Sequence, residues 1–338
     1  MSRRFTALLG ALLLTACSGA VPTPDGGAPD AGLVVPADET WAGGKHLAAA
    51  VTIPAGRVVE LAPGATVTLD AAVTVTVSGT LRGASAGALK GSGWGGLVVA
   101  SGGVVSLTGV DLVGATTALD VRGGGRATFS SGAITGAPTP FVMAAGATLA
   151  LSRVSVTGAS SPSTIAGQFD AARLDYQKVG GAEGLVLNDP QAVASISDST
   201  FEGTTTGSGD FIVSAAARSL HIEYSTIRGA HCGFHFGAIG QFVIDHVTSG
   251  GLAASAVPGD TNAWGGMFYG AGAGPNVISN SNFVDTGADL DLQGANGTLT
   301  ILNTHTGGKD VLAPSANTNF SWTPAEHAAM PILDAQPR

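Results

Sequence analysis

The stretches "LTGVDLVG" (107–114), "FSSGAITG" (129–136) and "LSRVSVTG" (151–158) share one pattern, in which apolar residues alternate with small or polar residues up to a closing glycine. The closing glycines follow one another at intervals of 22 residues. More degenerate copies continue as far as "ILNTHTGG" (301–308). Self-similarity at this period predicts a solenoid, because a single unit can bury its apolar face only by stacking on its neighbours.

The alternation inside each unit indicates strands rather than helices. In "VVSLTGVDL" (104–112) and "ATLALSRVSV" (147–156) the apolar residues recur with period two and are interrupted by glycine. No stretch of ten residues carries the helical period. We therefore predict an all-β parallel β-helix of about nine or ten turns, stacked about 4.8 Å apart, with Ile, Leu, Val and Phe facing the axis.

The first turns of the solenoid carry a resemblance to a known family. The segments "WAGGKHLAAAVTIPAGRVVELAPGATVTLDAAVTVTVSGTLRG" (41–83) and "SGWGGLVVASGG" (92–103), with the repeats after them, resemble the β-helix repeats of the pectin-lyase-like superfamily. The resemblance implies a single-stranded right-handed β-helix over 41–308, followed by a cap or tail at 309–338. It implies no single activity, because lyases, hydrolases, adhesins and inert surface proteins share this scaffold.

The N-terminus, "MSRRFTALLGALLLTACSGA" (1–20), combines a basic start with an apolar run too short to span a bilayer. The tetrad "LTAC" (14–17) resembles the lipobox of bacterial lipoproteins. That resemblance implies a lipoprotein signal peptide at 1–16 and lipidation of Cys17. The alternative is an ordinary signal peptide with a cysteine at this place by chance.

The segment 17–40 is rich in Pro, Gly, Asp and Ala and has too few large apolar residues to bury a core. We expect it to be a flexible tether between a lipid anchor and the solenoid. Ser18 stands where some Gram-negative bacteria place an aspartate that retains lipoproteins at the inner membrane. By that analogy the protein is expected at the outer membrane.

Charge and cysteine content narrow the range of partners. The formal net charge is −9 at pH 7, so a basic footprint for nucleic acid is absent. Attraction to anionic lipid is disfavoured too, so the lipid on Cys17 would hold the protein at the membrane. The chain has two cysteines. If Cys17 is lipidated, Cys232 cannot form an intramolecular disulfide.

Two acidic residues, Glu223 and Asp245, occupy equivalent places one repeat apart. If the isoleucines before them face inward, both carboxylates face outward on neighbouring turns, about 5 Å apart. Such a pair could bind calcium or share a proton, or it could be an outward polar stack with no ligand. Tyr224 and His246 follow these acids and are expected to point inward or to sit at a bend.

The stretch "GAHCGFHFGAIGQFVIDH" (229–246) contains three histidines and a cysteine. His231 and His235 share one face of a regular strand, whereas Cys232 points to the opposite face. A zinc site needs three or four converging ligands, so these three residues are not expected to bind one ion together. We expect Cys232 to be half-buried near the phenylalanines that follow it.

The segment "GDTNAWGGMFYG" (259–270) lies in a repeat that is longer than the others. Insertions in solenoids form loops on the outer face, where binding residues concentrate. Trp264, Phe268 and Tyr269 could therefore offer flat apolar surfaces to sugar rings. Alternatively, they fold back and cover the solenoid.

Two functions remain open from the sequence. The first is a lipid-anchored envelope protein with a non-catalytic binding, adhesive or structural role toward glycans or envelope partners, with no cofactor required. The second is a calcium-dependent polysaccharide lyase or a glycoside hydrolase. Lyases of the resembled superfamily combine calcium-binding acids with a basic Arg or Lys, so Glu223 and Asp245 with Arg218 or Arg228 could supply the parts. The two hypotheses differ in whether these residues line a common groove with Trp264.

Overall fold

The computed structural model describes residues 32–203, 209–250, 264–270, 272, 274–284, 288–292, 298–306, 311–312, 318–320, 333–335 and 337–338. The chain divides into two units, Met1–Ala31 and Gly32–Arg338, and all described residues belong to the second. The predicted signal peptide and Cys17 lie outside the described residues. Every regular element in the described part is a β-strand, so no helix there could span a membrane.

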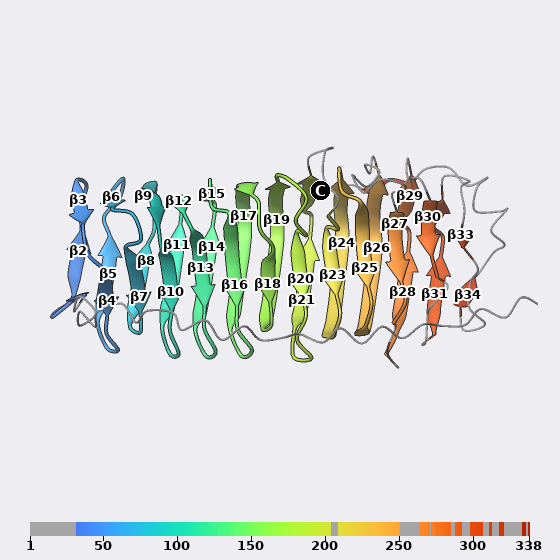
Figure 1. Cartoon of the computed structure of the whole chain (residues 1–338), viewed down its shortest axis with the longest axis horizontal. Coiled ribbons are helices and arrows are strands. Elements are labelled where there is room, and N and C mark those ends of the chain that lie inside the picture. The colour runs from blue at the N-terminus through green and yellow to red at the C-terminus, as the bar shows by residue number, and fades with distance from the viewer. Residues whose placement is uncertain are drawn as a thin grey trace, which may run out of the picture. The chain divides into compact units, whose positions relative to one another are not determined.

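The strands of Gly32–Arg338 form a parallel β-solenoid of about 11 turns, close to the predicted number (Figure 1). The all-β fold with a repeat of about 22 residues is thereby confirmed. One face is a 13-stranded parallel sheet, in which strands of successive turns pair with one another. In order, its strands are β1 (Leu33–Val34), β4 (Val51–Ile53), β7 (Thr74–Val77), β10 (Gly96–Val99), β13 (Thr117–Val121), β16 (Thr139–Met143), β18 (Ser163–Ile165), β20 (Leu185–Leu187), β23 (Ile212–Ser214), β25 (Cys232–Phe236), β27 (Trp264–Phe268), β30 (Ala288–Asp291) and β33 (Val311–Leu312).

The rest of each turn belongs to a second sheet of 21 strands. This sheet bends once per turn, so each turn contributes to it either one long, bent strand or two short strands. Its strands are β2 (Glu39–Trp41), β3 (Lys45–Leu47), β5 (Val58–Leu61), β6 (Thr66–Leu69), β8 (Thr80–Gly83), β9 (Gly87–Trp94), β11 (Val104–Thr108), β12 (Val110–Ala115), β14 (Arg126–Ser130), β15 (Ala133–Thr135), β17 (Thr148–Ala159), β19 (Gln168–Lys178), β21 (Val193–Ser197), β22 (Thr200–Gly203), β24 (Ala217–Arg228), β26 (Ile239–Gly250), β28 (Asn276–Ser279), β29 (Asn282–Val284), β31 (Leu299–Leu302), β32 (His305–Thr306) and β34 (Thr318–Phe320).

The sequence repeat sets the register of the stacked strands. Leu107 pairs with Phe129, and Phe129 pairs with Leu151, so equivalent positions of successive repeats lie directly above one another. All three side chains are buried. Because side chains alternate along a strand, one position in register fixes which residues of the whole strand face the interior.

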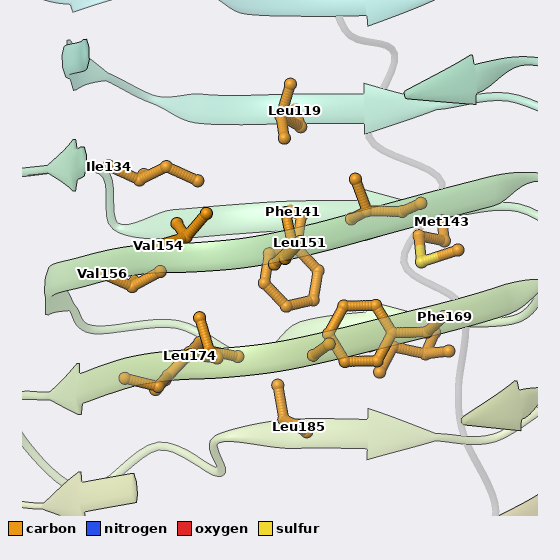
Figure 2. Packing of buried hydrophobic residues seen from close by; sticks show 14 of the residues in the cluster. Leu119, Ile134, Phe141, Met143, Leu151, Val154, Val156, Phe169, Leu174 and Leu185 are labelled. Carbon is orange, nitrogen blue, oxygen red and sulfur yellow. The ribbon is translucent and has the colours of Figure 1, made fainter. Parts of the chain in front are cut away.

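Stacked apolar side chains fill the interior (Figure 2). The rings of Phe141 and Phe169 stack with centroids 5.2 Å apart, and Tyr176 meets the edge of Phe211 at 5.8 Å. Aromatic pairs in such geometries add stabilisation beyond the area that they bury. The interior is therefore a packed core along the described turns.

From β11 to β32, a single residue in the left-handed conformation bends the second sheet at each described turn. This residue stands between the two halves of each layer, as Tyr224 does in β24 and His246 in β26, and so these two residues sit at the bend. Non-glycine residues rarely adopt positive φ unless the surrounding structure requires it. The column consists of Gly109, Ser131, Arg153, Arg173, Asp198, Tyr224, His246, Asn280 and Asn303.

Strand pairing extends past the predicted boundaries of the solenoid. β1 pairs with β4 although it lies in the segment predicted as a tether. At the other end, β33 pairs with β30 and β34 pairs with β31, within the segment predicted as a cap or tail.

The last described residues lie along the side of the solenoid. Leu333 exchanges two backbone–side-chain hydrogen bonds of 2.8 Å with Asn282, and Thr248 donates to the carbonyl of Ala335 at 3.0 Å. The guanidinium of Arg338 lies 3.5 Å from the ring centroid of Tyr224. The C-terminal residues thus run back across β29, β26 and β24, and Figure 1 marks the C-terminus beside β24.

Candidate functional site

The predicted acid pair lies on neighbouring strands in the expected register. Glu223 of β24 pairs with Asp245 of β26, and both side chains are partly exposed. Asp245, however, is held by the solenoid itself. Its Oδ1 accepts hydrogen bonds from Ser279 Oγ at 2.7 Å and from Asn280 Nδ2 at 2.9 Å, and its Oδ2 lies 2.8 Å from His246 Nδ1.

These hydrogen bonds decide the protonation of Asp245. Burial raises the pKa of its carboxyl, but the bonds from Ser279, His246 and Asn280 outweigh it, so the pKa lies below its ordinary value. A carboxyl that shares a proton with a neighbouring acid has a raised pKa instead. Asp245 is therefore an ionised structural acceptor. A calcium ion prefers six to eight oxygen ligands and would have to displace these donors.

The two candidate basic residues do not join the acids. Arg218 and Arg228 are exposed at opposite ends of β24, and Arg228 lies beyond the bend at Tyr224. Within the described part of the chain, neither arginine forms an ion pair with Glu223 or Asp245. In the described structure, Nε2 of His221 lies 3.8 Å from the carboxylate of Glu223.

The expected platform of aromatic rings is not formed as predicted. Trp264 and Phe268 belong to strand β27, which pairs with β25, rather than to a loop. Phe268 faces the core, where its ring stacks on Phe242 at 5.3 Å. Trp264 is buried against Cys232. Tyr269 is partly exposed and donates a hydrogen bond of 2.7 Å to Asp291.

A surface groove on the solenoid does not gather these residues. It is lined by small residues at the corner between the two sheets, among them Ala216, Gly237 and Ala238, together with Arg218. Glu223, Asp245 and Trp264 are not part of this lining. The parts expected of a lyase are therefore dispersed over the described surface.

A different cluster forms on the outer face of the 13-stranded sheet, where the strand β25 is irregular. Gly233 and Phe234 are consecutive in sequence, yet both face the interior: Phe234 is in the core, and a Cβ on Gly233 would lie 2.1 Å from Ser249 Oγ. Two inward residues in succession shift the alternation by one. Cys232 and His235 therefore share the outer face, which corrects the expectation that they point to opposite faces.

Cys232 also differs from the prediction in its surroundings. Its side chain is fully buried rather than half-buried, and it packs with Trp264 and Met267 instead of the phenylalanines of the core. Its sulfur lies 3.2 Å from Met267 Sδ and 3.6 Å from His231 Nδ1.

Asp210 links the two histidines of this cluster. It lies just before β23, one turn from β25, and its side chain is only 16% exposed. Its Oδ1 is 3.1 Å from His231 Nδ1, and its Oδ2 is 2.6 Å from His235 Nδ1. One potential metal-ligand atom from each of Asp210, His231 and Cys232 lies within 4.8 Å of the other two, a spacing that could hold a metal ion.

The protonation states of the cluster follow from these contacts. Burial raises the pKa of Asp210, but the hydrogen bonds from His231 and His235 lower it far more, so its pKa lies well below the ordinary value. The bond to Asp210 raises the pKa of His235, although burial opposes it. Asp210 is thus an anion in contact with two imidazoles.

Lys178 supplies a buried positive charge beside Asp210. Its Nζ donates to the carbonyls of Ala182 at 2.7 Å, Gly209 at 2.9 Å and Asp210 at 3.3 Å, and the residue is 4% exposed. Burial lowers the pKa of this amine to about 8, against the attraction of Asp210 and Glu183. The lysine ties the segment that carries Asp210 to the end of β19.

The arrangement does not match a cysteine–histidine–aspartate catalytic triad. In such a triad the nucleophile and the acid bind the two different nitrogens of the histidine. Here Cys232 and Asp210 both approach Nδ1 of His231, and the thiol has no exposed surface. The geometry is suited to ligation rather than to nucleophilic attack.

Comparisons with protein-family models, with curated proteins and with solved structures found no match for this chain.

Proposed function

We propose that this protein is a lipid-anchored, right-handed β-solenoid of the bacterial cell envelope that acts by binding or as a structural element rather than by catalysis. The observation that carries the non-catalytic role is the state of Asp245, whose carboxylate is engaged by three donors of the solenoid. Arg218 and Arg228 form no ion pair with the two acids in the described structure, and the oxygens of Asp245 are already occupied by donors of the solenoid.

The lipobox-like tetrad before Cys17 supports the envelope location, and the Pro/Gly-rich segment after it supports a tethered domain. In this proposal the partners are the membrane, through lipid on Cys17, and polysaccharides or proteins of the envelope. The net charge of −9 argues against nucleic acid as a ligand. Ser18 after the cysteine favours the outer membrane of a Gram-negative cell.

The outer surface of the second sheet supports binding to an extended partner. Thr108, Ser130 and Ser152 lie in one column across successive strands, and Thr108 and Ser130 are hydrogen-bonded to each other at 2.9 Å. Ser197 lies further along the same column. Hydroxyl groups both donate and accept hydrogen bonds, so such a column can contact a polymer of hydroxylated units.

The alternative proposal, a calcium-dependent polysaccharide lyase or hydrolase, is tested directly by activity. The full chain, purified in detergent, is incubated with acidic and neutral polysaccharides plus calcium, and new reducing ends are measured. Glu223→Ala/Asp245→Ala is the test variant, and Glu60→Ala/Asp120→Ala, which removes two other outer-face acids, is the matched control. We expect no cleavage by any of these proteins. Cleavage that is lost in the test variant and kept in the control would overturn the non-catalytic proposal.

The anchoring part of the proposal has its own test. Wild-type protein is expected in the membrane fraction of cells and the Cys17→Ser variant in the soluble fraction. Equal membrane association of the two proteins would contradict lipidation at Cys17.

A further inference from the structure

We infer that Asp210, His231 and Cys232 form a binding site for a divalent transition ion that accepts sulfur ligands, with Zn²⁺ the best match. The inference does not depend on the proposed function, since it rests on the geometry of the cluster beside β25. Asp210, His231 and Cys232 supply one oxygen, one nitrogen and one sulfur ligand, a set that zinc uses in proteins.

Two of the three distances between the ligand atoms are close to those around a tetrahedral ion. Zinc bonds of about 2.0–2.1 Å to nitrogen or oxygen and about 2.3 Å to sulfur place the donors of a tetrahedron about 3.3–3.6 Å apart. His231 Nδ1 is 3.1 Å from Asp210 Oδ1 and 3.6 Å from Cys232 Sγ. The ligand atoms of Asp210 and Cys232 lie within 4.8 Å of each other, so binding would require side-chain shifts that bring this third pair to the tetrahedral spacing.

Neighbouring residues fix the ligands in place. His235 holds the second oxygen of Asp210 at 2.6 Å, which is the imidazole–carboxylate contact that commonly orients metal ligands. Lys178 anchors the backbone of Asp210, and Trp264 and Met267 pack on Cys232. These contacts reduce the conformational freedom that the ligands would otherwise lose on binding.

The charge and solvent access of the site are compatible with an incoming cation. Asp210 and the Cys232 sulfur, which gives up its proton when it binds the metal, would supply two negative ligands beside the ammonium group of Lys178. Entry is from the side of Asp210 and His235, whose side chains are 16% and 35% exposed. A fourth ligand position is thereby open to His235 or to a water molecule.

The ligand set also discriminates between metals. Calcium and magnesium bind through oxygen and need several such ligands, whereas this cluster offers one carboxylate with imidazole and thiol groups. The cluster therefore selects a transition ion over the abundant alkaline-earth ions.

The test uses the full chain carrying Cys17→Ser, which leaves Cys232 as the only cysteine. The metal-free protein is titrated with Zn²⁺, and the bound metal is counted by mass spectrometry after dialysis, with Ca²⁺ and Mg²⁺ as comparisons. Co²⁺ is then bound in place of zinc, and its absorption spectrum is recorded. We expect one Zn²⁺ per chain, no retained Ca²⁺ or Mg²⁺, and a thiolate-to-cobalt charge-transfer band in the spectrum.

Three variants and one control complete the test. Cys232→Ser and His231→Gln remove ligands and should abolish stoichiometric binding, while His235→Gln should weaken it about 10- to 100-fold. His221→Gln changes an exposed histidine outside the cluster and should bind as the parent does. Circular dichroism checks that each variant is folded. The inference would be overturned by binding of clearly less than one Zn²⁺ per chain, or by retention of zinc in Cys232→Ser. A cobalt spectrum without a thiolate band would also overturn it, and this result needs only the parent protein.

Discussion

Replacing Gly233 by alanine tests the irregularity that turns Cys232 to the outer face. An ideal Cβ at this position would lie 2.1 Å from Ser249 Oγ, 2.8 Å from the carbonyl oxygen of Gly265 and 3.3 Å from Ser249 Cβ. The serine can rotate, but it then gives up its hydrogen bond of 3.1 Å to Gly265. The carbonyl is part of the backbone and cannot move without shifting strand β27.

The expected cost follows from these contacts. Overpacking a close-packed interior costs about 1–3 kcal/mol, and loss of one hydrogen bond costs about 1 kcal/mol. We expect Gly233→Ala to lower local stability by about 2–4 kcal/mol. Exchange of the backbone amides of β25 should then be roughly 25- to 700-fold faster, because every 1.4 kcal/mol is a factor of ten.

Hydrogen–deuterium exchange read by mass spectrometry is the suitable assay, because turns of a solenoid can open locally. Gly237→Ala is the matched control in the same turn, since its Cβ would meet nothing closer than the Ser214 carbonyl oxygen at 3.7 Å. It should change exchange very little. If Gly233→Ala behaves like Gly237→Ala, Gly233 does not face the interior, and the argument for an outward Cys232 fails.

Three further predictions address the core, the C-terminal residues and the pH dependence. Phe169→Ala, which removes a fully buried ring stacked on Phe141, should destabilise the protein by about 3–5 kcal/mol in denaturant titrations; a loss below 1 kcal/mol would contradict the stacked core. Asn282→Ala removes both hydrogen bonds to Leu333, so carboxypeptidase should remove the C-terminal residues faster than in the parent, and equal rates would count against this attachment. The pKa of Asp245 in the folded state lies below its unfolded value of 3.8. The ionised carboxylate therefore stabilises the fold above about pH 3.8, and this stabilisation is lost as the pH falls through the folded-state pKa. The stability difference between the parent and Asp245→Asn, measured by thermal unfolding, should therefore shrink on acidification below about pH 4; a difference that grows would refute the assigned direction.

The fold could be predicted from the sequence because one local pattern is repeated. Glycines at intervals of 22 residues and period-two alternation fix both the strand faces and the stacking. For the same reason the sequence predicts that Glu223 and Asp245 are neighbours and that Tyr224 and His246 can sit at a bend. Each of these relations depends only on register.

The cluster around Cys232 could not be predicted in this way, because it depends on a break in the alternation. Whether Gly233 and Phe234 can both face inward is decided by the space beside Ser249 on another strand. Strand alternation alone therefore assigns Cys232 to the wrong face. The sequence offers only a weak indication of this break in alternation. In "CGF" (232–234) and "WGG" (264–266), which lie in two successive turns, a glycine follows the outward-facing residue.

The misplacement of the aromatic residues has a related cause. The sequence shows that the repeat containing Trp264 is longer than the others, but not where the extra residues lie. The pairing of β25 with β27 places Trp264 and Phe268 inside the regular strand. Phe268 is consequently a core residue, although its sequence context suggested a loop.

We have inferred that a shift of alternation in β25 brings Cys232 together with Asp210 and His231 as metal ligands on the outer face. X-ray absorption spectroscopy of the zinc-loaded full chain, with Cys17 replaced by serine, tests it most directly. We expect one sulfur neighbour at about 2.3 Å together with nitrogen and oxygen neighbours at about 2.0–2.2 Å. A coordination shell of nitrogen and oxygen alone would contradict it, because the zinc would then be bound without Cys232.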